Sequence, residues 1–548
     1  MQGRQEFFLG PFTGGYDSLD PPDAMDNTLM ARGSVNLSTR ERGAVTKRKG
    51  YAKTKSDFSA DTYTESLGVH EFFDGTRGKR SLVHVKRNTS SNDIKYETNG
   101  AYNLPTASAN FTTSASIGSA TTTEQYVSFA DGLLDRLYIG AKWLSVVKYI
   151  SWDGAVFSIT NTTTTGSVRS FTSPVGLATY FGRVWCFLDS GTEGGEYLFW
   201  SNLAGTQFDR DLSWIQFPDG GPITGLARIG NDLLVFKQSE IYVLSGGENV
   251  DRALTTRKLQ ISVGCVAPRS IVTHNGWVYF MSDNGFYKTN GSDISLISRS
   301  IQNEFDQFSR TDLSRVCGAH NREDNTIVWL VAFGESATEN NRAYCYDYDK
   351  NIWCSPYTNQ AFTSICTYHN DYTGKIAKEI MIASGETKSG ATYIWNYGLS
   401  DDGTLTNAKL VTKAIHFGTP SRRKLVRRVY VHWGSRGPTL GSGTTGTRWG
   451  VDPWGTSAFP GGSPTPLKLR VFSSYGNADS DTAPTGEVTS SSSGSEYTPY
   501  YKLDRFYSGS SGHYHQLQFE DYNFGSILGG PWSVHGFTIL FVTKGQRP

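Results

Sequence analysis

The feature that most constrains the fold is a recurring pair of short apolar segments joined at Asn-Gly, Asp-Gly or Gly-Asn. Clear examples lie at 150–157, 229–236 and 279–287. Gly and Asn tolerate the positive φ that tight hairpin turns require, so each dipeptide predicts two paired strands. Units of this kind recur at uneven intervals of roughly 35–50 residues, the range in which propeller blades fall. Because one unit cannot bury its faces alone, the repeat predicts a stack of blades.

Seven strand-rich units can be counted between about residues 67 and 398. They begin near Leu67, Tyr126, Val175, Ile223, Ser270, Val316 and Phe362. The first unit contains a long Thr/Ser tract at 112–123, which an insertion would also explain, so six and seven blades both stay open. One short helix is predicted within 299–315, where Ile301, Phe305 and Phe308 follow helical spacing.

The chain divides by texture into three parts. Residues 1–60 are predicted to be an extended N-terminal arm, because Gly14-Gly15 and Pro21-Pro22 interrupt any regular element. Residues 61–400 are predicted to form the β-propeller. Residues 401–548 contain a few long strands separated by long Gly- and Ser-rich excursions, which is typical of a β-sandwich. The predicted fold class is therefore all-β, and abundant Trp, Tyr and Phe with scarce Met agree with it.

Composition excludes several classes of protein. Lys and Arg total 52 against 51 Asp and Glu, so the net charge is +1, which argues against a dedicated nucleic-acid binder. Six cysteines lie in apolar runs with no CxxC pair and no zinc-like spacing, which predicts small buried thiols in a reducing compartment. The N-terminus lacks the apolar core of a signal peptide, and no apolar run approaches the ~20 residues of a membrane helix. We expect a soluble protein made in a cytoplasm.

Catalytic patterns are incomplete throughout the sequence. Gly75–Lys79 has the wrong spacing for a nucleotide-binding loop, and His70-Glu71 lacks the second histidine of a zinc protease because Asp74 stands in its place. The scattered carboxylates are expected to be turn formers and surface charges, although carboxylate pairs stay open. The sequence predicts no enzyme, no cofactor and no metal.

Two local clusters of titratable residues remain. His513 and His515 are spaced to share one side of a strand, and a metal site there would need a third ligand such as His535 or Asp521; surface or interface histidines are the favoured interpretation. The densest positive charge is the basic cluster Arg422, Arg423, Lys424, Arg427 and Arg428.

The basic cluster has two interpretations. On a regular strand Lys424 and Arg428 would face one way and Arg427 the other. Such a face could dock an acidic partner or contact DNA phosphates. Alternatively, the charges protect an edge strand from aggregation.

A family resemblance emerges from the order of the motifs. The N-terminal part contains Gly14-Gly15-Tyr16-Asp17, Asp20-Pro21-Pro22, Val35-Asn36 and the closing run Gly-Ala-Val-Thr-Lys-Arg-Lys-Gly-Tyr at 43–51. This resembles the opening of tail hub, or nozzle, proteins of short-tailed bacteriophages. The segments that follow in the order of that family are 229–237, 240–246, 263–271, 278–287, 322–329 and 344–353. The resemblance covers roughly residues 10–400.

The resemblance implies a structural virion protein without enzymatic activity or cofactor. Such proteins form rings, usually hexamers, below the portal and its adaptor; they close the DNA channel and conduct DNA on infection. The implied partners are further copies of the chain, the head-to-tail adaptor ring, a tail fibre, spike or needle protein, and passing viral DNA. The implied location is the virion tail, after assembly in the bacterial cytoplasm. In that setting the basic cluster is expected at a protein–protein contact, because a conduit that bound phosphates would retain its DNA.

Other classes are less well supported by the sequence. The hairpin from Tyr346-Asp347 to Trp353 resembles a kelch blade, which would imply a glycan-binding or glycan-cleaving propeller, but this pattern appears once rather than in most blades. A tailspike would show long, regular parallel β-helix repeats, which we do not find.

Overall fold

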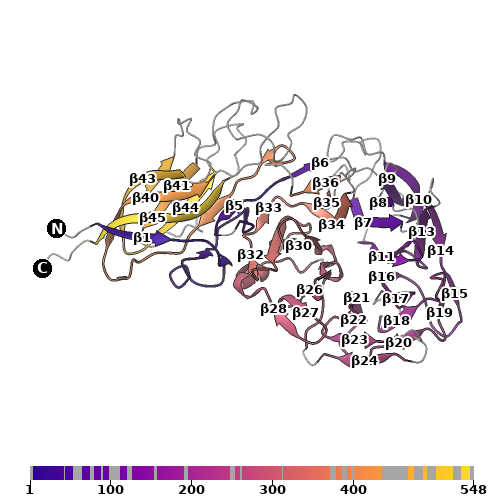
Figure 1. Ribbon diagram of the computed structural model, residues 1–548. Coiled ribbons are helices and arrows are strands. Elements are labelled where there is room, and N and C mark those ends of the chain that lie inside the picture. Colours follow the sequence, from indigo (N-terminus) through magenta and orange to yellow (C-terminus); the bar gives the residue numbers. More distant parts are fainter. Residues whose placement is uncertain are drawn as a thin grey trace.

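In the computed structural model the described residues are those of nineteen segments. These are 4–41, 43–53, 65–74, 79–87, 91–97, 111–119, 126–152, 157–189, 195–246, 253–259, 262–311, 313–370, 378–385, 392–396, 400–434, 467–473, 486–489, 502–521 and 532–543. The chain folds into a propeller and a smaller two-sheet sandwich that lie side by side (Figure 1). None of the helices in these segments has the length and apolar character of a membrane span.

Seven antiparallel sheets form the propeller, and their innermost strands close into a ring. These strands are β7 (Glu65–Asp74), β11 (Ser128–Leu133), β16 (Pro174–Tyr180), β21 (Ile223–Ile229), β25 (Val272–His274), β29 (Cys317–Asn321) and β34 (Phe362–Asn370). Each packs against the next, and β34 packs against β7, so the ring is complete (Figure 1). Each of these strands begins within two residues of the start expected for its unit. The first unit is a full blade rather than an insertion, which decides the blade number as seven.

The remaining blade strands follow outward in chain order. In blades one to four they are β8 (Lys79–Arg87), β9 (Ser91–Glu97), β10 (Phe111–Ser119), β12 (Arg136–Gly140), β13 (Lys148–Trp152), β14 (Phe157–Asn161), β17 (Arg183–Leu188), β18 (Tyr197–Trp200), β20 (Trp214–Gln216), β22 (Asp232–Lys237), β23 (Ile241–Ser245) and β24 (Thr255–Lys258). In blades five to seven they are β26 (Trp277–Ser282), β27 (Gly285–Thr289), β28 (Ile294–Leu296), β30 (Thr326–Val331), β31 (Arg342–Asp347), β32 (Ile352–Trp353), β33 (Tyr357–Thr358), β35 (Lys378–Gly385) and β36 (Thr392–Trp395). A parallel pair, β15 (Thr163–Thr165) with β19 (Gln207–Asp209), links blades two and three.

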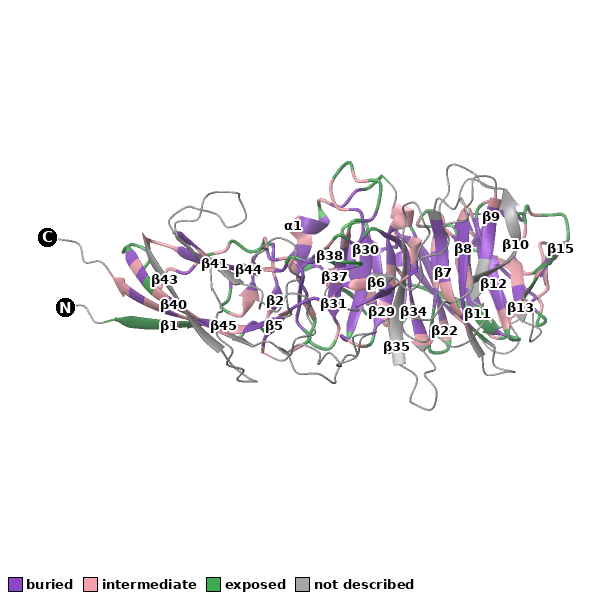
Figure 2. Ribbon diagram, turned by 90° about the horizontal axis from the view of Figure 1, so that it is seen from above, coloured by how far each residue is buried: buried purple, intermediate pink, exposed green. Residues whose placement is uncertain are grey.

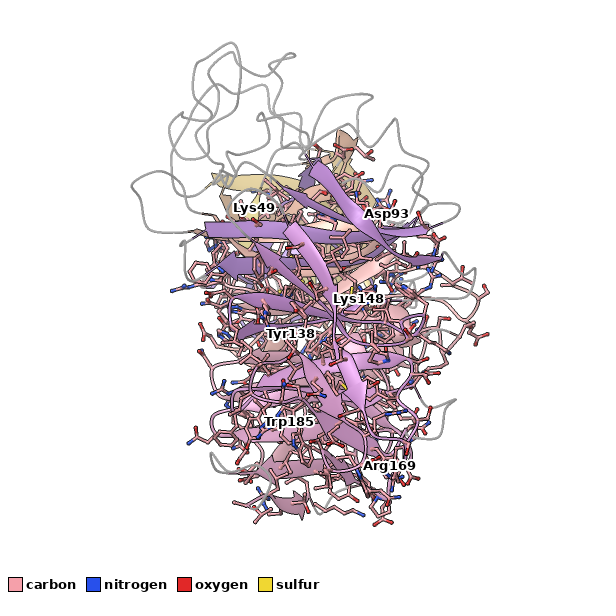
Figure 3. All side chains as sticks on the ribbon, turned by 90° about the vertical axis from the view of Figure 1, so that its right-hand side faces the viewer. Lys49, Asp93, Tyr138, Lys148, Arg169 and Trp185 are labelled. Atoms are coloured by element: carbon pink, nitrogen blue, oxygen red, sulfur yellow. The ribbon has the colours of Figure 1, made fainter. Side chains whose placement is uncertain are left out.

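Every pair of neighbouring blades shares an apolar cluster. Tyr138 of β12 packs in the cluster between blades two and three, and Trp185 of β17 packs in the cluster between blades three and four (Figure 3). Neighbouring inner strands approach so closely that a Cβ on Gly68 of β7 would lie 2.8 Å from the Phe129 ring of β11. Blades one and seven share the cluster of Val69, Leu82, Cys366, Tyr368 and Ile394, so the apolar contacts also run around the whole ring.

The N-terminal segment closes the last blade. β6 (Tyr51–Lys53) pairs antiparallel with β36 and supplies the fourth strand of blade seven. β37 (Ser400–Asp401) pairs with β6 in turn, and β38 (Thr404–Leu405) continues this sheet. β6 lies some 340 residues before β36 in the sequence. The propeller is therefore closed by a strand from the segment that was expected to be a separate arm.

Two sheets form the sandwich. The larger has the order β4 (Leu37–Ser38), β5 (Val45–Lys47), β45 (Ser533–Thr543), β40 (Lys424–Gly434) and β43 (Lys502–Gly512), and β1 (Gln5–Leu9) also pairs with β45. The smaller contains β39 (Lys409–Val411), β44 (His515–Asp521), β41 (Leu467–Ser473) and β42 (Gly486–Thr489). The segment expected as an arm therefore supplies strands to both parts of the molecule.

One apolar core runs from the sandwich into the propeller. It contains Phe537 and Val429 of the sandwich together with Trp329 and Phe286 of blades five and six. Phe12, Tyr16 and Met30 of the N-terminal segment belong to the same core, and the last two lie on or beside the short parallel pair of β2 (Gly15–Tyr16) and β3 (Leu29–Met30). Buried residues run through this junction and through the blades, whereas most residues of β1 at the far end are exposed (Figure 2).

The expected helix within 299–315 is shorter than its pattern indicated. It consists of a 3₁₀ turn, η2 (Arg299–Ile301), the four-residue α1 (Gln302–Phe305) and a later turn, η3 (Leu313–Arg315). A further turn, η1 (Pro268–Ser270), precedes β25. Ile301, Phe305 and Phe308 are all buried in the shared core, so the helical spacing was a true sign of burial.

Candidate functional site

The basic cluster lies at the end of the sandwich where strand β1 begins. Arg422 and Arg423 belong to the turn before β40, and Arg427 and Arg428 lie within β40. This strand is flanked by β43 on one side and β45 on the other. The edge-strand interpretation is therefore wrong, because β40 has both of its hydrogen-bonding edges occupied.

A β-bulge at Arg427 changes which way the basic side chains point. The register with both neighbouring strands shifts between Val426 and Arg428. Val426 and Val429 are both buried, so Arg427 and Arg428 both lie on the outer face. The expectation that Lys424 and Arg428 face the same way is wrong, since the extra residue inverts the alternation beyond it.

Lys424 is structural rather than part of an exposed face. Its side chain is buried, and its ammonium group donates to the Thr419 carbonyl. Burial, and then the charge of Arg422, lower the pKa of Lys424. In contrast, Arg422, Arg423 and Arg427 are exposed, and none of the three forms an ion pair with a carboxylate of the described residues.

The His513 and His515 pair is separated by the turn between β43 and β44. His513 is half-buried and its Nδ1 lies 3.0 Å from the Pro420 carbonyl oxygen, whereas His515 is buried with Nε2 3.2 Å from the Lys424 carbonyl oxygen. Burial lowers the pKa of His515 to about 4. The two rings do not share one strand face. No group of three or more His, Cys, Asp or Glu side chains suited to a metal ion occurs within the described segments.

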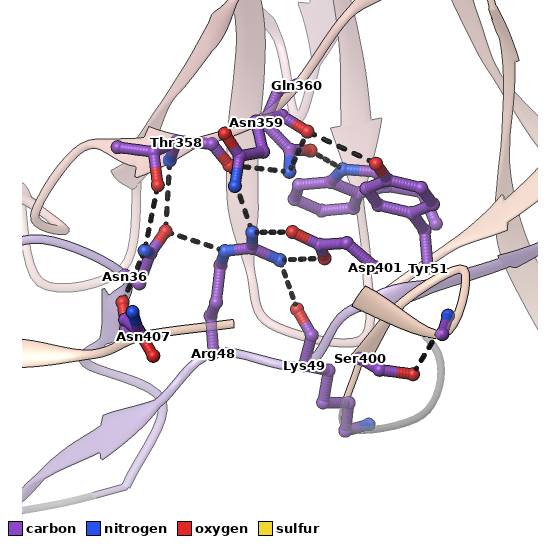
Figure 4. A network of polar contacts seen from close by, with 12 residues as sticks. Asn36, Arg48, Lys49, Tyr51, Thr358, Asn359, Gln360, Ser400, Asp401 and Asn407 are labelled. Atoms are coloured by element: carbon purple, nitrogen blue, oxygen red, sulfur yellow. Dashed lines mark hydrogen bonds and ion pairs between the residues drawn. The ribbon is translucent and has the colours of Figure 1, made fainter. Parts of the chain in front are cut away.

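An extensive buried polar network is centred on Arg48, between β5 and β6 (Figure 4). Two of its donors bind the Asp401 carboxylate at 2.8 and 2.6 Å, a third binds the Asn36 side-chain oxygen at 2.8 Å, and the last two bind the carbonyls of Lys49 and Thr358. All five guanidinium N–H groups are thus used. Both charged side chains of this pair are almost fully buried, at 2% and 1% exposure.

This network, which we call the joint, connects Arg48 to three parts of the fold. Asn36 precedes β4 of the sandwich, Thr358 belongs to blade six, and Asp401 belongs to β37 beside the closing strand β6. Asn36 donates 2.9 Å to the Thr358 hydroxyl and 2.6 Å to the Asn407 carbonyl. Burial, and then the Asp401 charge, raise the pKa of Tyr51 to about 12. The sequence shows Arg48 within a basic run, but nothing local indicates a partner 353 positions away.

A second buried group lies on the propeller side of the same junction. The hydroxyls of Tyr16 and Tyr344 both donate to the Glu304 carboxylate, and Arg342 lies 3.6 Å from it. These side chains come from β2, β31 and α1. Glu304 therefore fastens the N-terminal segment to blade six.

Polar side chains of the inner strands also pair between neighbouring blades. His369 Nδ1 lies 2.7 Å from Glu71 of blade one, and His70 lies 3.2 Å from Asp131 of blade two. Burial acts to raise the pKa of Asp131, but the hydrogen bond and charge of His70 outweigh it and hold this pKa below its usual value. These contacts bind blade one to both of its neighbours.

Polar and aromatic side chains of the inner strands also link blades five, six and seven. The rings of His274 and His320 stack with centroids 3.7 Å apart, and the Thr367 hydroxyl donates 2.6 Å to the His320 carbonyl. The His320 ring also lies 3.2 Å from the Tyr348 hydroxyl. The sequence gives no local sign of this group, because its members lie on strands that are far apart in the chain.

The cysteines are buried and form no disulfides, as expected from their apolar surroundings. Burial raises the pKa of the Cys265 thiol to about 12 and that of Cys354 to about 11. A thiol with such a pKa is protonated at neutral pH, so these two are poor nucleophiles.

Known proteins do not place this chain in a family. No family model matches the sequence, and no curated protein matches it. Solved structures with a similar shape include the WD40 domain of Toxoplasma gondii coronin, with a TM-score of 0.35 and 8% identity over 66% of this chain and 86% of that one. Another is the Dos1 propeller, with a TM-score of 0.30 and 13% identity over 47% of this chain and 66% of that one.

Proposed function

We propose that the chain is a structural protein of a bacteriophage tail: a hub or nozzle subunit that assembles into a ring, with six copies implied by the family, below the portal and adaptor. The ring closes the DNA channel and conducts DNA on infection. Tail fibre, spike or needle proteins would attach below it. The function requires no covalent chemistry, no cofactor and no metal.

One observation carries the proposal: the N-terminal motif residues behind the family resemblance are those that join propeller to sandwich. Asn36 and Arg48 form the centre of the joint, and Tyr51 begins the closing strand. Gly15 and Tyr16 of the opening motif contact Ile352 and Glu304 of the propeller. A family likeness confined to turns would be a weaker argument, because turn motifs occur in many β-proteins.

The joint suits a subunit that bears mechanical load. Two domains linked by a flexible connector would move independently. Here a continuous apolar core, a buried ion pair and the strand β6, which the N-terminal segment adds to blade seven, oppose such motion. A ring that seals pressurised DNA needs its subunits to keep their shape while their interfaces carry the force.

The basic cluster supports assembly through the sandwich, with a smaller set of residues than expected. Arg422, Arg423 and Arg427 are exposed and available to a partner, whereas Lys424 is committed to its own domain. Exposed arginines contribute mainly to the orientation and rate of association, and buried aromatic anchors would supply most affinity.

Electron microscopy of the purified protein tests the proposal directly. We expect class averages of a closed ring with a central opening wide enough for duplex DNA, and the same ring at the tail vertex of particles labelled with antibody to this chain. A protein that stays monomeric at high concentration, or that is absent from particles, would overturn the proposal.

A glycan-binding or glycan-cleaving propeller is the second candidate. It is favoured by two pairs of side chains on the inner strands, His369 with Glu71 and His70 with Asp131. Incubation with bacterial polysaccharides tests it, with Glu71→Gln as the variant and the exposed Glu339→Gln as the matched control. Turnover that is lost in the first variant alone would place this candidate first.

A further inference from the structure

The exposed arginines have a counterpart of opposite charge on the same chain. Residues 17–26, which we call the aspartate loop, contain Asp17, Asp20, Asp23 and Asp26 and no lysine or arginine. Asp20, Asp23 and Asp26 are exposed. None of the four carboxylates forms an ion pair with a cation of the described residues.

The aspartate loop is held in place by neutral contacts rather than by cations. Asn303 donates 2.6 Å to the Ser18 carbonyl, and Ser18 N–H donates 2.8 Å to the Ser300 carbonyl. On the other side Ala414 N–H donates 2.8 Å to the Pro22 carbonyl, and the buried Met25 anchors the loop in a small apolar cluster. The nearby Lys413 donates to the Met25 carbonyl, a neutral acceptor. The loop thus presents its charges from a fixed backbone.

The positive counterpart is the arginine tip, defined as Arg4, Arg422, Arg423 and Arg427. All four are exposed, and within the described part of the chain none of them is ion-paired. Arg423 donates 3.5 Å to the Ser511 carbonyl, which is a weak contact at the limit of hydrogen bonding. An apolar side chain is exposed beside each surface: Phe8 on β1, at 47%, and Leu19 in the aspartate loop, at 37%.

The two surfaces do not neutralise each other within one chain. Arg4 directly precedes β1, and the first residues of β40 and of β1 both pair with the last residues of β45, so the arginine tip lies at that end of the sandwich. The aspartate loop bonds to Asn303 of α1, and Figure 2 shows β1 and α1 well apart. No described ion pair joins them. Complementary surfaces at separate places on one subunit generate a head-to-tail contact, which closes into a ring if the rotation between subunits allows it.

We propose that the arginine tip of one copy of this chain binds the aspartate loop of a second copy. This inference rests on the ring assembly proposed above and adds its contact surface. The guanidinium N–H groups donate to the carboxylates of Asp20, Asp23 and Asp26. Phe8 and Leu19 supply apolar contact at the borders of the interface. Because the contact is exposed and charged, salt weakens it. The screening length at physiological ionic strength is about 8–10 Å.

Charge reversal provides the test. The first variant changes Arg422→Glu, Arg423→Glu and Arg427→Glu, and the second changes Asp20→Lys, Asp23→Lys and Asp26→Lys. Each variant carries like charges on both surfaces, so we expect self-association to weaken about 100-fold or more. A 1:1 mixture restores both contacts, one native and one reversed, and should regain wild-type mass in mass photometry. The chain with all six changes should also assemble.

A matched control separates local contact from net charge. Lys142→Glu, Arg257→Glu and Lys258→Glu alter the net charge as much as the first variant, but lie on blades two to four. This control should assemble normally. Unchanged urea midpoints for all variants exclude misfolding as the cause.

The outcomes separate this inference from the proposed function. Rings that form equally well from wild type and both variants overturn the inference and leave the function standing. Restored assembly in the mixture, with no ring on tail particles, supports the inference and overturns the function. Variants that assemble normally but lose duplex DNA binding would make nucleic acid the partner of the arginine tip and overturn the inference. A wild type that never self-associates overturns both.

Discussion

Two arginines of this chain, Arg48 and Arg427, show how position decides what a charge does. Arg48 is buried in the joint, where all five of its donors are used and its carboxylate partner is equally buried. Arg427 sits on a bulge of a sheet, exposed and without a described ion pair. Both belong to basic runs in the sequence, Lys47-Arg48-Lys49 and Arg427-Arg428. The comparison teaches that the same sequence signal marks an internal fastener in one region and a docking surface in the other.

Removing one half of the buried pair should have the largest effect. Arg48→Ala leaves Asp401 buried without its cation, so we expect the free energy of unfolding to fall by about 3–5 kcal/mol. Urea denaturation followed by tryptophan fluorescence measures it. Arg40→Ala is the matched control: Arg40 is partly exposed beside Glu323, and its loss should cost about 1 kcal/mol or less.

The double variant Arg48→Met with Asp401→Leu sharpens this result. If the buried charge left alone is the cause, replacing both partners with apolar side chains should destabilise less than Arg48→Ala does. An Arg48→Ala effect no larger than that of Arg40→Ala would show that the joint does not depend on the ion pair.

Acid should reveal what burial does to the His515 imidazole. Burial lowers the pKa of His515 to about 4, while the unfolded chain binds the proton near pH 6.5. Stability is therefore fully present above pH 6.5 and is lost as the pH falls toward 4, by about 3 kcal/mol for this residue. His515→Gln should flatten the pH profile in that window. A His515→Gln profile equal to that of the wild type would contradict the assignment.

Glu304 tests whether a hydrogen-bonded carboxylate also fastens the domains. Glu304→Gln keeps the size of the side chain but removes the charge that accepts two tyrosine hydroxyls. Bonds to a charged group contribute about 1.5–3 kcal/mol, so we expect a loss near 2 kcal/mol in urea denaturation. Glu339→Gln on the exposed loop after β30 is the control and should change stability little. A neutral result for Glu304→Gln would limit the fastening role to Arg48.

The smallest expected effect on folding is that of the exposed arginines. Arg422→Ser, Arg423→Ser and Arg427→Ser together should change the free energy of unfolding of the monomer by about 0.5 kcal/mol or less, because none has a described ionic partner. The same changes should still weaken assembly, most clearly at low salt. A large loss of monomer stability would show that these arginines stabilise the fold, as Arg48 does, and would contradict the contrast between the two regions.

Much of the propeller could be predicted from the sequence because its signals are local. Asn-Gly and Asp-Gly turns and apolar strands mark each hairpin, and the inner strands begin within two residues of their expected positions. The direction of side chains on β40 could not be predicted in the same way. A bulge depends on the pairing with β43 and β45, so alternation read along one strand assigned Arg428 to the wrong face.

The candidate site was predicted less well than the fold, since its members are distant in sequence. Arg48 and Asp401 are 353 positions apart, and Glu304 is 288 positions from Tyr16. Each looks like an ordinary surface charge or turn residue in its local context. The aspartate loop was visible as a Pro-containing motif, but its lack of cationic partners appears only in three dimensions.

By itself the sequence determined the all-β class, the units of the propeller and the burial of its cysteines, because turn chemistry and apolar periodicity act over a few residues. The tertiary structure alone decided that the first unit is a blade, that β6 closes the ring, and that two domains share one core. It also decided which basic residues are buried and which are free to bind. These properties depend on contacts between segments hundreds of residues apart, and no local pattern encodes which of many similar strands and charges will meet.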